Sequence, residues 1–124
     1  MYEFNNQKPL YLQLKEIIEE AILNNVLKPD DAVPSIRMMA RDYRLNPLTV
    51  TNAIDELVDS GILYKKRGIG MFVSENAKQM IREEQFDVFR TTELVVTIEK
   101  AKLLGVLKTE IDNIVNKVFG GENA

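Results

Sequence analysis

The chain contains no cysteine, no histidine and no tryptophan. The absence of cysteine excludes a disulfide framework and a thiolate metal site. The absence of histidine removes the commonest zinc ligand and the usual general base of enzymes. We therefore expect neither a metal nor a cofactor. An enzyme is the least favoured class: Asp, Glu, Lys or Ser could still act as catalytic groups, but no cluster of carboxylates marks a pocket.

Long apolar runs and a strong charge of one sign are missing as well. No stretch approaches the roughly 20 apolar residues that span a bilayer, and the first residues, MYEFNNQKPL, lack the basic start and apolar stretch of a signal peptide. We therefore expect no membrane association and a cytoplasmic location. The formal net charge is −3 at pH 7, which argues against non-specific nucleic-acid binding. Any DNA contact must come from the placement of a few cations.

The content of hydrophobic residues suffices for an ordinary folded core. The 124 residues are 45% hydrophobic and 28% charged, which is enough for one domain or a small domain with an appendage. Leu10 to Leu23 is predicted to be a helix because its apolar residues recur every three or four positions, with Gln13 and Glu19 on the polar face. A turn follows, with a very short strand at Ala32-Val33.

Two further helices are predicted close together. Ser35 is a suitable N-cap for a short helix that runs from Ile36 to about Tyr43. Asn46 caps the next helix, in which proline occupies the first position and costs nothing there. That helix continues to Ser60. Two helices joined by three or four residues, the second with a small polar N-terminal face, describe a helix-turn-helix.

The segment YKKRGIGMFVS, Tyr64 to Ser74, places three cations against a Gly-x-Gly and then an apolar run. A P-loop would need more glycines, a Lys-Ser/Thr pair and a helix directly after it. A dinucleotide-binding loop would need a third glycine and a helix. Because a strand follows here, we interpret the segment as a β-hairpin whose glycines supply the positive φ angles of a tight turn.

The rest of the chain is predicted to be helical. Glu75 to Leu104 lacks proline and glycine and shows a loose helical period, with a break near RTTE. Gly105 ends this region. A last helix from about Lys108 to Phe119 has a wide apolar face. The tail from Gly120 to Ala124 is predicted to be disordered.

A helical hairpin of this size buries little apolar surface by itself. Exposed apolar stripes on it would invite association, so we expect a symmetric homodimer. If the helix-turn-helix binds DNA, twofold symmetry would place two recognition helices on successive major grooves, and the operator would be an inverted repeat. The predicted dimerisation residues are Phe86, Phe89, Val95, Ile98, Ile111, Ile114, Val115 and Val118.

The predicted fold is mainly α with a small β-hairpin: a winged helix-turn-helix over residues 1–74, then a short all-helical dimerisation region over 75–124. In this order and spacing the chain resembles the GntR-type bacterial transcription regulators over nearly all of residues 9–73. The short helical C-terminus with EKAKLLGVLKTEI resembles the YtrA branch. The segments that carry the main resemblance are PLYLQL, LKPDDAVPSIRMMA, NPLTVTNAIDELVDSGIL and KRGIGMFV.

The resemblance implies a sequence-specific DNA-binding regulator, most often a repressor, that controls neighbouring transport genes. Wider-family members carry arginines in the recognition helix where this chain has Pro47 and Thr51, and the NP pair agrees better with the YtrA branch. In a helix-turn-helix, the first turn of the recognition helix reaches base edges in the major groove. Asn52 suits adenine, and Leu48 or a threonine methyl suits thymine.

Arg37 lies in the first turn of its helix, where a cation opposes the helix dipole by about 0.3–1 kcal/mol. A phosphate bound there would reverse that penalty, and the resemblance places a phosphate-contacting arginine at this position. Arg41 and Arg44 either meet phosphate or pair with Asp42 and other surface acids, and Ser35 serves as a cap or also as a contact. The predicted DNA-binding residues are Ser35, Arg37, Arg41, Leu48, Thr49, Thr51, Asn52, Lys66, Arg67, Gly68 and Gly70.

A second function stays open at this point. The negative net charge and the arginine-poor recognition helix also suit a winged-helix protein-interaction module that does not bind DNA. A small-molecule effector is a further open partner, because no constellation of residues marks a pocket for one.

Overall fold

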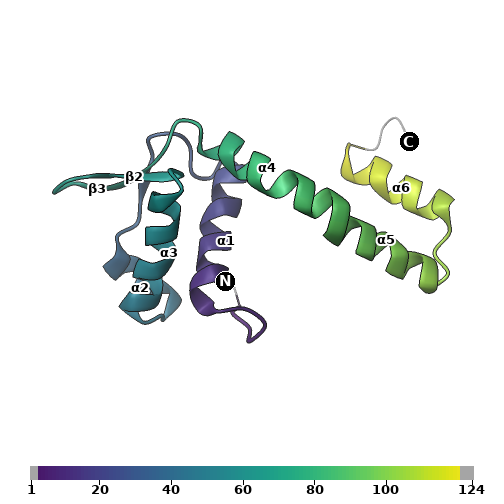
Figure 1. The fold of residues 1–124 in the computed structure, drawn as a ribbon, viewed down its shortest axis with the longest axis horizontal. Coiled ribbons are helices and arrows are strands. Elements are labelled where there is room, and N and C mark those ends of the chain that lie inside the picture. The colour runs from purple at the N-terminus through teal and green to yellow at the C-terminus, as the bar shows by residue number, and fades with distance from the viewer. Residues whose placement is uncertain (1–2, 121–124) are drawn as a thin grey trace. The chain divides into compact units, whose positions relative to one another are not determined.

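The computed structural model describes residues 3–120 of the chain (Figure 1). It divides into two compact units, residues 1–83 and 84–124. The division falls later than the predicted boundary after Ser74, because the first part of the fourth helix completes the core of the first unit. The first unit contains α1 (Leu10–Leu23), β1 (Ala32–Val33), α2 (Ile36–Tyr43), α3 (Pro47–Asp59), β2 (Leu63–Lys66), β3 (Gly70–Val73) and the start of α4 (Ala77–Val88).

The core of the first unit is built around α3, which packs against α1, α2 and β2. One side of α3 is buried, with Ile54 and Leu57 fully inaccessible to solvent. From α1, Leu14 and Ile18 meet this core, and Ile81 of α4 is fully buried in it. The helix periods read from the sequence therefore identify the faces that are removed from water.

The strands form one antiparallel sheet in the order β1-β3-β2. The predicted hairpin pairs Leu63 with Val73 and Lys66 with Gly70. The very short strand predicted before Pro34 adds to the other edge of β3, where Ala32 faces Phe72. The fold is thus mainly helical with a small sheet, as predicted. Among residues 3–120, none of the helices combines the length and apolar character that crossing a bilayer requires.

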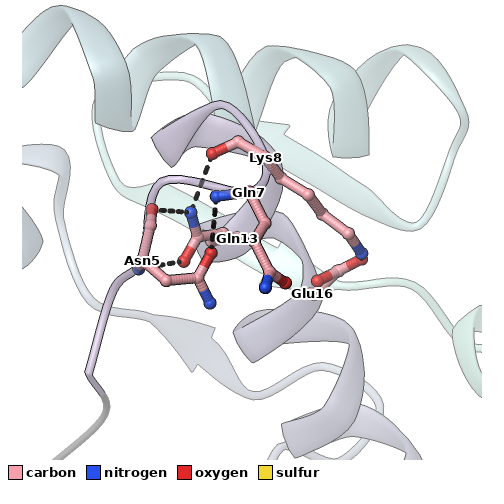
Figure 2. Close-up of polar contacts among 5 residues, drawn as sticks. All are labelled: Asn5, Gln7, Lys8, Gln13 and Glu16. Atoms are coloured by element: carbon pink, nitrogen blue, oxygen red, sulfur yellow. Dashed lines mark hydrogen bonds and ion pairs between the residues drawn. The ribbon is translucent and has the colours of Figure 1, made fainter.

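The prediction that Gln13 and Glu19 lie on the polar face of α1 is wrong, since both side chains are buried. The segment before α1 folds back over the helix, and Gln13 holds it there (Figure 2). The Nε2 group of Gln13 donates to the carbonyls of Asn5, at 2.7 Å, and Lys8, at 2.8 Å. Its Oε1 accepts the N–H of Asn5 at 3.0 Å. A periodic pattern reports residue type, and it cannot reveal that a neighbouring segment covers the polar face.

Replacing Gln13 by leucine should lower the free energy of unfolding by about 1–3 kcal/mol, because all three hydrogen bonds disappear and the groups they satisfied must find water. The measurement is urea unfolding at fixed protein concentration. Gln79→Leu is the matched control, because Gln79 is exposed and its amide donates to Oε1 of Glu83 at 2.9 Å on the helix surface. It should change stability by less than about 0.5 kcal/mol. Equal unfolding midpoints for the two variants would contradict the role given to Gln13.

The base of the hairpin is tied to the loop before β1. The hydroxyl of Tyr64 donates to Oδ1 of Asp30 at 2.6 Å, and the Tyr64 ring stacks on Phe72 with centroids 5.8 Å apart. The hydrogen bond to Asp30, followed by desolvation and the negative charge of Asp30, raises the pKa of Tyr64 above its usual value of 10.0. The bond therefore favours the neutral phenol.

Tyr64 should titrate at a higher pH than an ordinary tyrosine. Because its folded-state pKa is raised, the stabilisation from this bond is complete below the unfolded pKa of about 10 and is lost as the pH rises through the folded pKa. The phenolate absorbance of the wild type minus that of Tyr64→Phe isolates this group. Asp30→Asn should lower the pKa of Tyr64, and a Tyr64 pKa at or below the ordinary value in the wild type would refute the assignment.

The second unit contains the end of α4, a π-helical turn η1 (Phe89–Glu93), α5 (Leu94–Leu103) and α6 (Lys108–Val118). The predicted break near RTTE is this π-helical turn, and it joins α4 to α5 without a gap. Within it, the hydroxyl of Thr91 donates to the carbonyl of Asp87 at 2.6 Å. Gly105, with φ 84°, follows the end of α5 as predicted. The predicted disordered tail lies, beyond Gly120, outside the described residues.

Candidate nucleic-acid interface

The N-terminal half of α3 exposes two side chains, Leu48 and Asn52, to solvent. Asn46 begins the helix, because its Oδ1 accepts the N–H of Leu48 at 2.8 Å, and Pro47 fills the first helical position. Leu48 is 65% exposed and Asn52 is also exposed, whereas Thr49 is half-buried. The first turn holds no acidic residue. These side chains are free to meet the edges of bases.

The hydroxyl of Thr51 is less available for a base contact than its position in the sequence predicts. Its hydroxyl donates to the carbonyl of Pro47 at 2.9 Å, within the same helix. The hydroxyl proton is therefore already used, and the methyl group remains as the contacting part of this half-buried side chain. Acidic side chains lie only in the second half of α3, where Glu56 pairs with Lys15 at 3.4 Å.

The start of α2 presents a cap and a cation. The Oγ of Ser35 accepts the N–H of Met38 at 3.1 Å, so the hydroxyl acts as the predicted N-cap and keeps its own proton for a further acceptor. Arg37 is exposed and makes no ion pair within the described part of the chain. Its guanidinium is available to an external anion.

Arg41 has an intramolecular partner. Its Nε lies 3.3 Å from Oδ1 of Asp42, and both side chains are exposed. An exposed pair of this kind contributes about 0–1 kcal/mol. The pair therefore competes weakly with any phosphate that Arg41 could reach.

The hairpin extends away from the helices of its unit (Figure 1). Its tip, between the end of β2 at Lys66 and the start of β3 at Gly70, carries the predicted cations. Lys66 is not free at this tip: its Nζ lies 4.6 Å from the centroid of the Phe72 ring, a cation–π contact on one face of the sheet. Arg67 is exposed. A Cβ added to Gly68 or Gly70 would meet no atom within 4 Å, so other molecules can approach the backbone there closely.

Ile69, between these glycines, was not singled out in the sequence. It is 73% exposed at the turn of the hairpin. An apolar residue flanked by two glycines at a turn cannot be buried by its own hairpin. The Gly-Ile-Gly pattern therefore indicates an exposed apolar side chain at the tip. Apolar side chains in such positions can insert into a minor groove.

The chain matches the family described as "Bacterial regulatory proteins, gntR family" over residues 10–73. It is 33% identical over 109 residues to the uncharacterized HTH-type transcriptional regulator YhcF of Bacillus subtilis, covering 88% of each chain. It is 37% identical over 82 residues to the HTH-type transcriptional repressor YtrA of the same organism, covering 66% of this chain and 63% of YtrA.

Solved structures share the fold. A GntR family transcriptional regulator from Listeria monocytogenes superposes with a TM-score of 0.72 at 29% identity, covering 92% of this chain and 98% of that one. AraR(DBD) in complex with operator ORX1 matches with a TM-score of 0.55 at 28% identity, covering 60% of this chain and 93% of that one. The chain therefore belongs to the gntR family of bacterial regulatory proteins and is a DNA-binding regulator of transcription, not an enzyme.

Proposed function

We propose that this protein is a homodimeric repressor that binds an inverted-repeat operator, with α3 in the major groove. The observation that carries the proposal is the N-terminal half of α3, where Leu48 and Asn52 are exposed and the first turn holds no acidic residue. Arg37 and Arg67 are exposed cations from the two elements that flank a recognition helix in a winged fold. Bases and phosphates thus have separate sets of partners.

Repression is the mode favoured by the relatives. YtrA is named a transcriptional repressor, and so is NagR of Bacillus subtilis, which is 39% identical to this chain over 67 residues. A bound dimer would block a promoter by occupying it. We place the protein in the cytoplasm, where bacterial promoters are found, and retain control of neighbouring transport genes as the expectation that the YtrA resemblance implies.

In the proposed complex, the amide of Asn52 pairs with the N6 and N7 edge of an adenine, and Leu48 meets a thymine methyl group. Arg37 binds a phosphate at the start of α2, where the helix dipole already attracts anions. Arg67 and the backbone at Gly68 and Gly70 approach the adjacent minor groove or its phosphates. Ser35 adds a hydroxyl donor beside Arg37.

The homodimer is supported by the apolar surface of the second unit. Neither α5 nor α6 buries any residue within the single chain. Ile98 is 44% exposed and Phe89 50%, and many large apolar side chains of this unit are still more open to solvent. A monomer rarely leaves so many apolar side chains in contact with water. The predicted dimerisation residues Phe86, Phe89, Val95, Ile98, Ile111, Ile114, Val115 and Val118 are the proposed interface.

Arg37→Ala should weaken binding to all duplexes alike and reduce the slope of log affinity against log salt by about 1, because one phosphate contact is lost. Asn52→Ala should instead remove about 1–3 kcal/mol of discrimination at one base pair. Fluorescence anisotropy measures both, with labelled DNA from upstream of the protein's own gene and a scrambled duplex at two salt concentrations.

A wild-type protein without salt-dependent affinity for any duplex would contradict the proposed operator binding. It would favour the protein-interaction module, which also predicts tolerance of charge reversal at Arg37 and Arg67. Equal losses on specific and scrambled DNA for both alanine variants would leave DNA binding in place but refute the division between phosphate and base contacts.

Ile98→Glu should convert the dimer to a monomer, because a charge would enter an apolar interface, and the monomer should bind the operator more weakly. The measurement is sedimentation velocity together with the anisotropy titration. Val96→Glu is the matched control: Val96 is on the same helix, 61% exposed and about 200° around the axis from Ile98. A dimeric Ile98→Glu protein, or equal dissociation of both variants, would contradict the proposed interface.

A further inference from the structure

Within residues 3–120, four helices end in the same backbone motif. Just beyond the helix, one residue adopts the left-handed conformation, and the N–H of the next residue donates to a carbonyl five positions back, with N···O distances of 2.8 or 2.9 Å. The helices are α1, α2, α3 and α5. The left-handed residues are, in the same order, Asn25 (φ 62°), Arg44 (φ 56°), Gly61 (φ 83°) and Gly105 (φ 84°).

Arg44 is the exception in this set. Glycine adopts the left-handed conformation without a steric penalty, and asparagine tolerates it better than other side chains do. Among the described residues with positive φ, Arg44 alone is neither glycine, asparagine nor aspartate. The chain therefore uses the favourable residue types at the ends of α1, α3 and α5 and a strained one only at the end of α2.

The strain at Arg44 cannot relax locally. The N–H of Arg44 donates to the carbonyl of Arg41 at 3.3 Å, and the N–H of Leu45 donates to that of Ala40 at 2.9 Å. Leu45 is half-buried and packs against the core. A different φ at Arg44 would break these bonds and pull Leu45 out of its site.

Contacts within the chain do not explain why an arginine stands here. The side chain of Arg44 is exposed and makes no hydrogen bond or ion pair with any residue between 3 and 120. A cation does interact favourably with the C-terminal end of a helix dipole. Arg41 already supplies that charge in the last turn of α2, from an ordinary helical position.

The position of Arg44 suggests what the side chain is for. It lies in the turn of the helix-turn-helix, two residues before Asn46, which begins the recognition helix. In a helix-turn-helix the first helix crosses the phosphate backbone and the start of the second enters the groove. A guanidinium in the turn between them faces an anionic surface and offers five N–H donors to it.

We propose that Arg44 is a further DNA-contacting residue, which binds a backbone phosphate beside the groove that α3 enters. The inference rests on the proposed function, because it requires a bound duplex. The contact would fix the orientation of α3 on the DNA without reading a base. It would also offset the local strain, which the free protein carries uncompensated.

The test compares Arg44→Gly, Arg44→Lys and the wild type by anisotropy on the own-gene and scrambled duplexes, with thermal unfolding of each protein. Arg44→Gly should leave Tm unchanged or raise it by a few degrees, because strain is relieved. Its affinity should fall about fivefold on both duplexes, and the salt slope should fall by about 1. Arg44→Lys, which keeps the charge, should retain most of the affinity.

Asn25→Gly is the matched control, because it makes the same kind of backbone change in the same motif at the end of α1. It should leave DNA affinity and salt slope unchanged. An Arg44→Gly protein with wild-type affinity and slope would overturn the proposal, and so would a Tm lowered by several degrees, which would show a structural role instead. A wild type that binds no duplex would refute the proposed function itself, which is a different result.

Discussion

The structure of the DNA-binding unit depends on the burial of one side of α3. Its apolar stripe packs on α1, α2 and β2, and Ile54 and Leu57 are completely removed from water. Fully burying a side chain of this size contributes roughly 1.5–3 kcal/mol. Because this face is fixed to the core, the opposite face and the first turn, with Leu48 and Asn52, must point outward. The packing that stabilises the unit is thus also what orients the helix that meets DNA.

Much of this arrangement could be predicted from the sequence because its determinants are local. The caps Ser35 and Asn46 mark the starts of α2 and α3 within a few residues of chain, and each makes the predicted bond to a backbone N–H. The glycines of the hairpin have the positive φ that a tight turn requires. Periodicity then identifies the buried faces, and these signals together give the order of a winged helix-turn-helix.

Contacts between distant segments could not be predicted in this way. Gln13 is buried because the residues before α1 fold back on it, and nothing in the helical period announces that return. The cation–π contact of Lys66 with Phe72 follows from the pairing of β2 with β3, whose register the sequence pattern does not define; Lys66 stays a predicted DNA contact. Ile69 is exposed because it lies in the turn between β2 and β3, away from the core. Each of these depends on which residues become neighbours in space.

The π-helical turn at Phe89–Glu93 determines which side chains before and after it share a face of the helix. An α-helix advances about 100° per residue, so Phe86 and Ile98 would lie about 120° apart around an unbroken helix. A π-helical turn absorbs one extra residue and brings them to within about 20° of each other. A relative one residue shorter here, with a plain α-helix, would show the same faces. Deleting one residue at this point would therefore leave the exposed faces of the helix in place. Deleting two would rotate α5 about its axis relative to the end of α4.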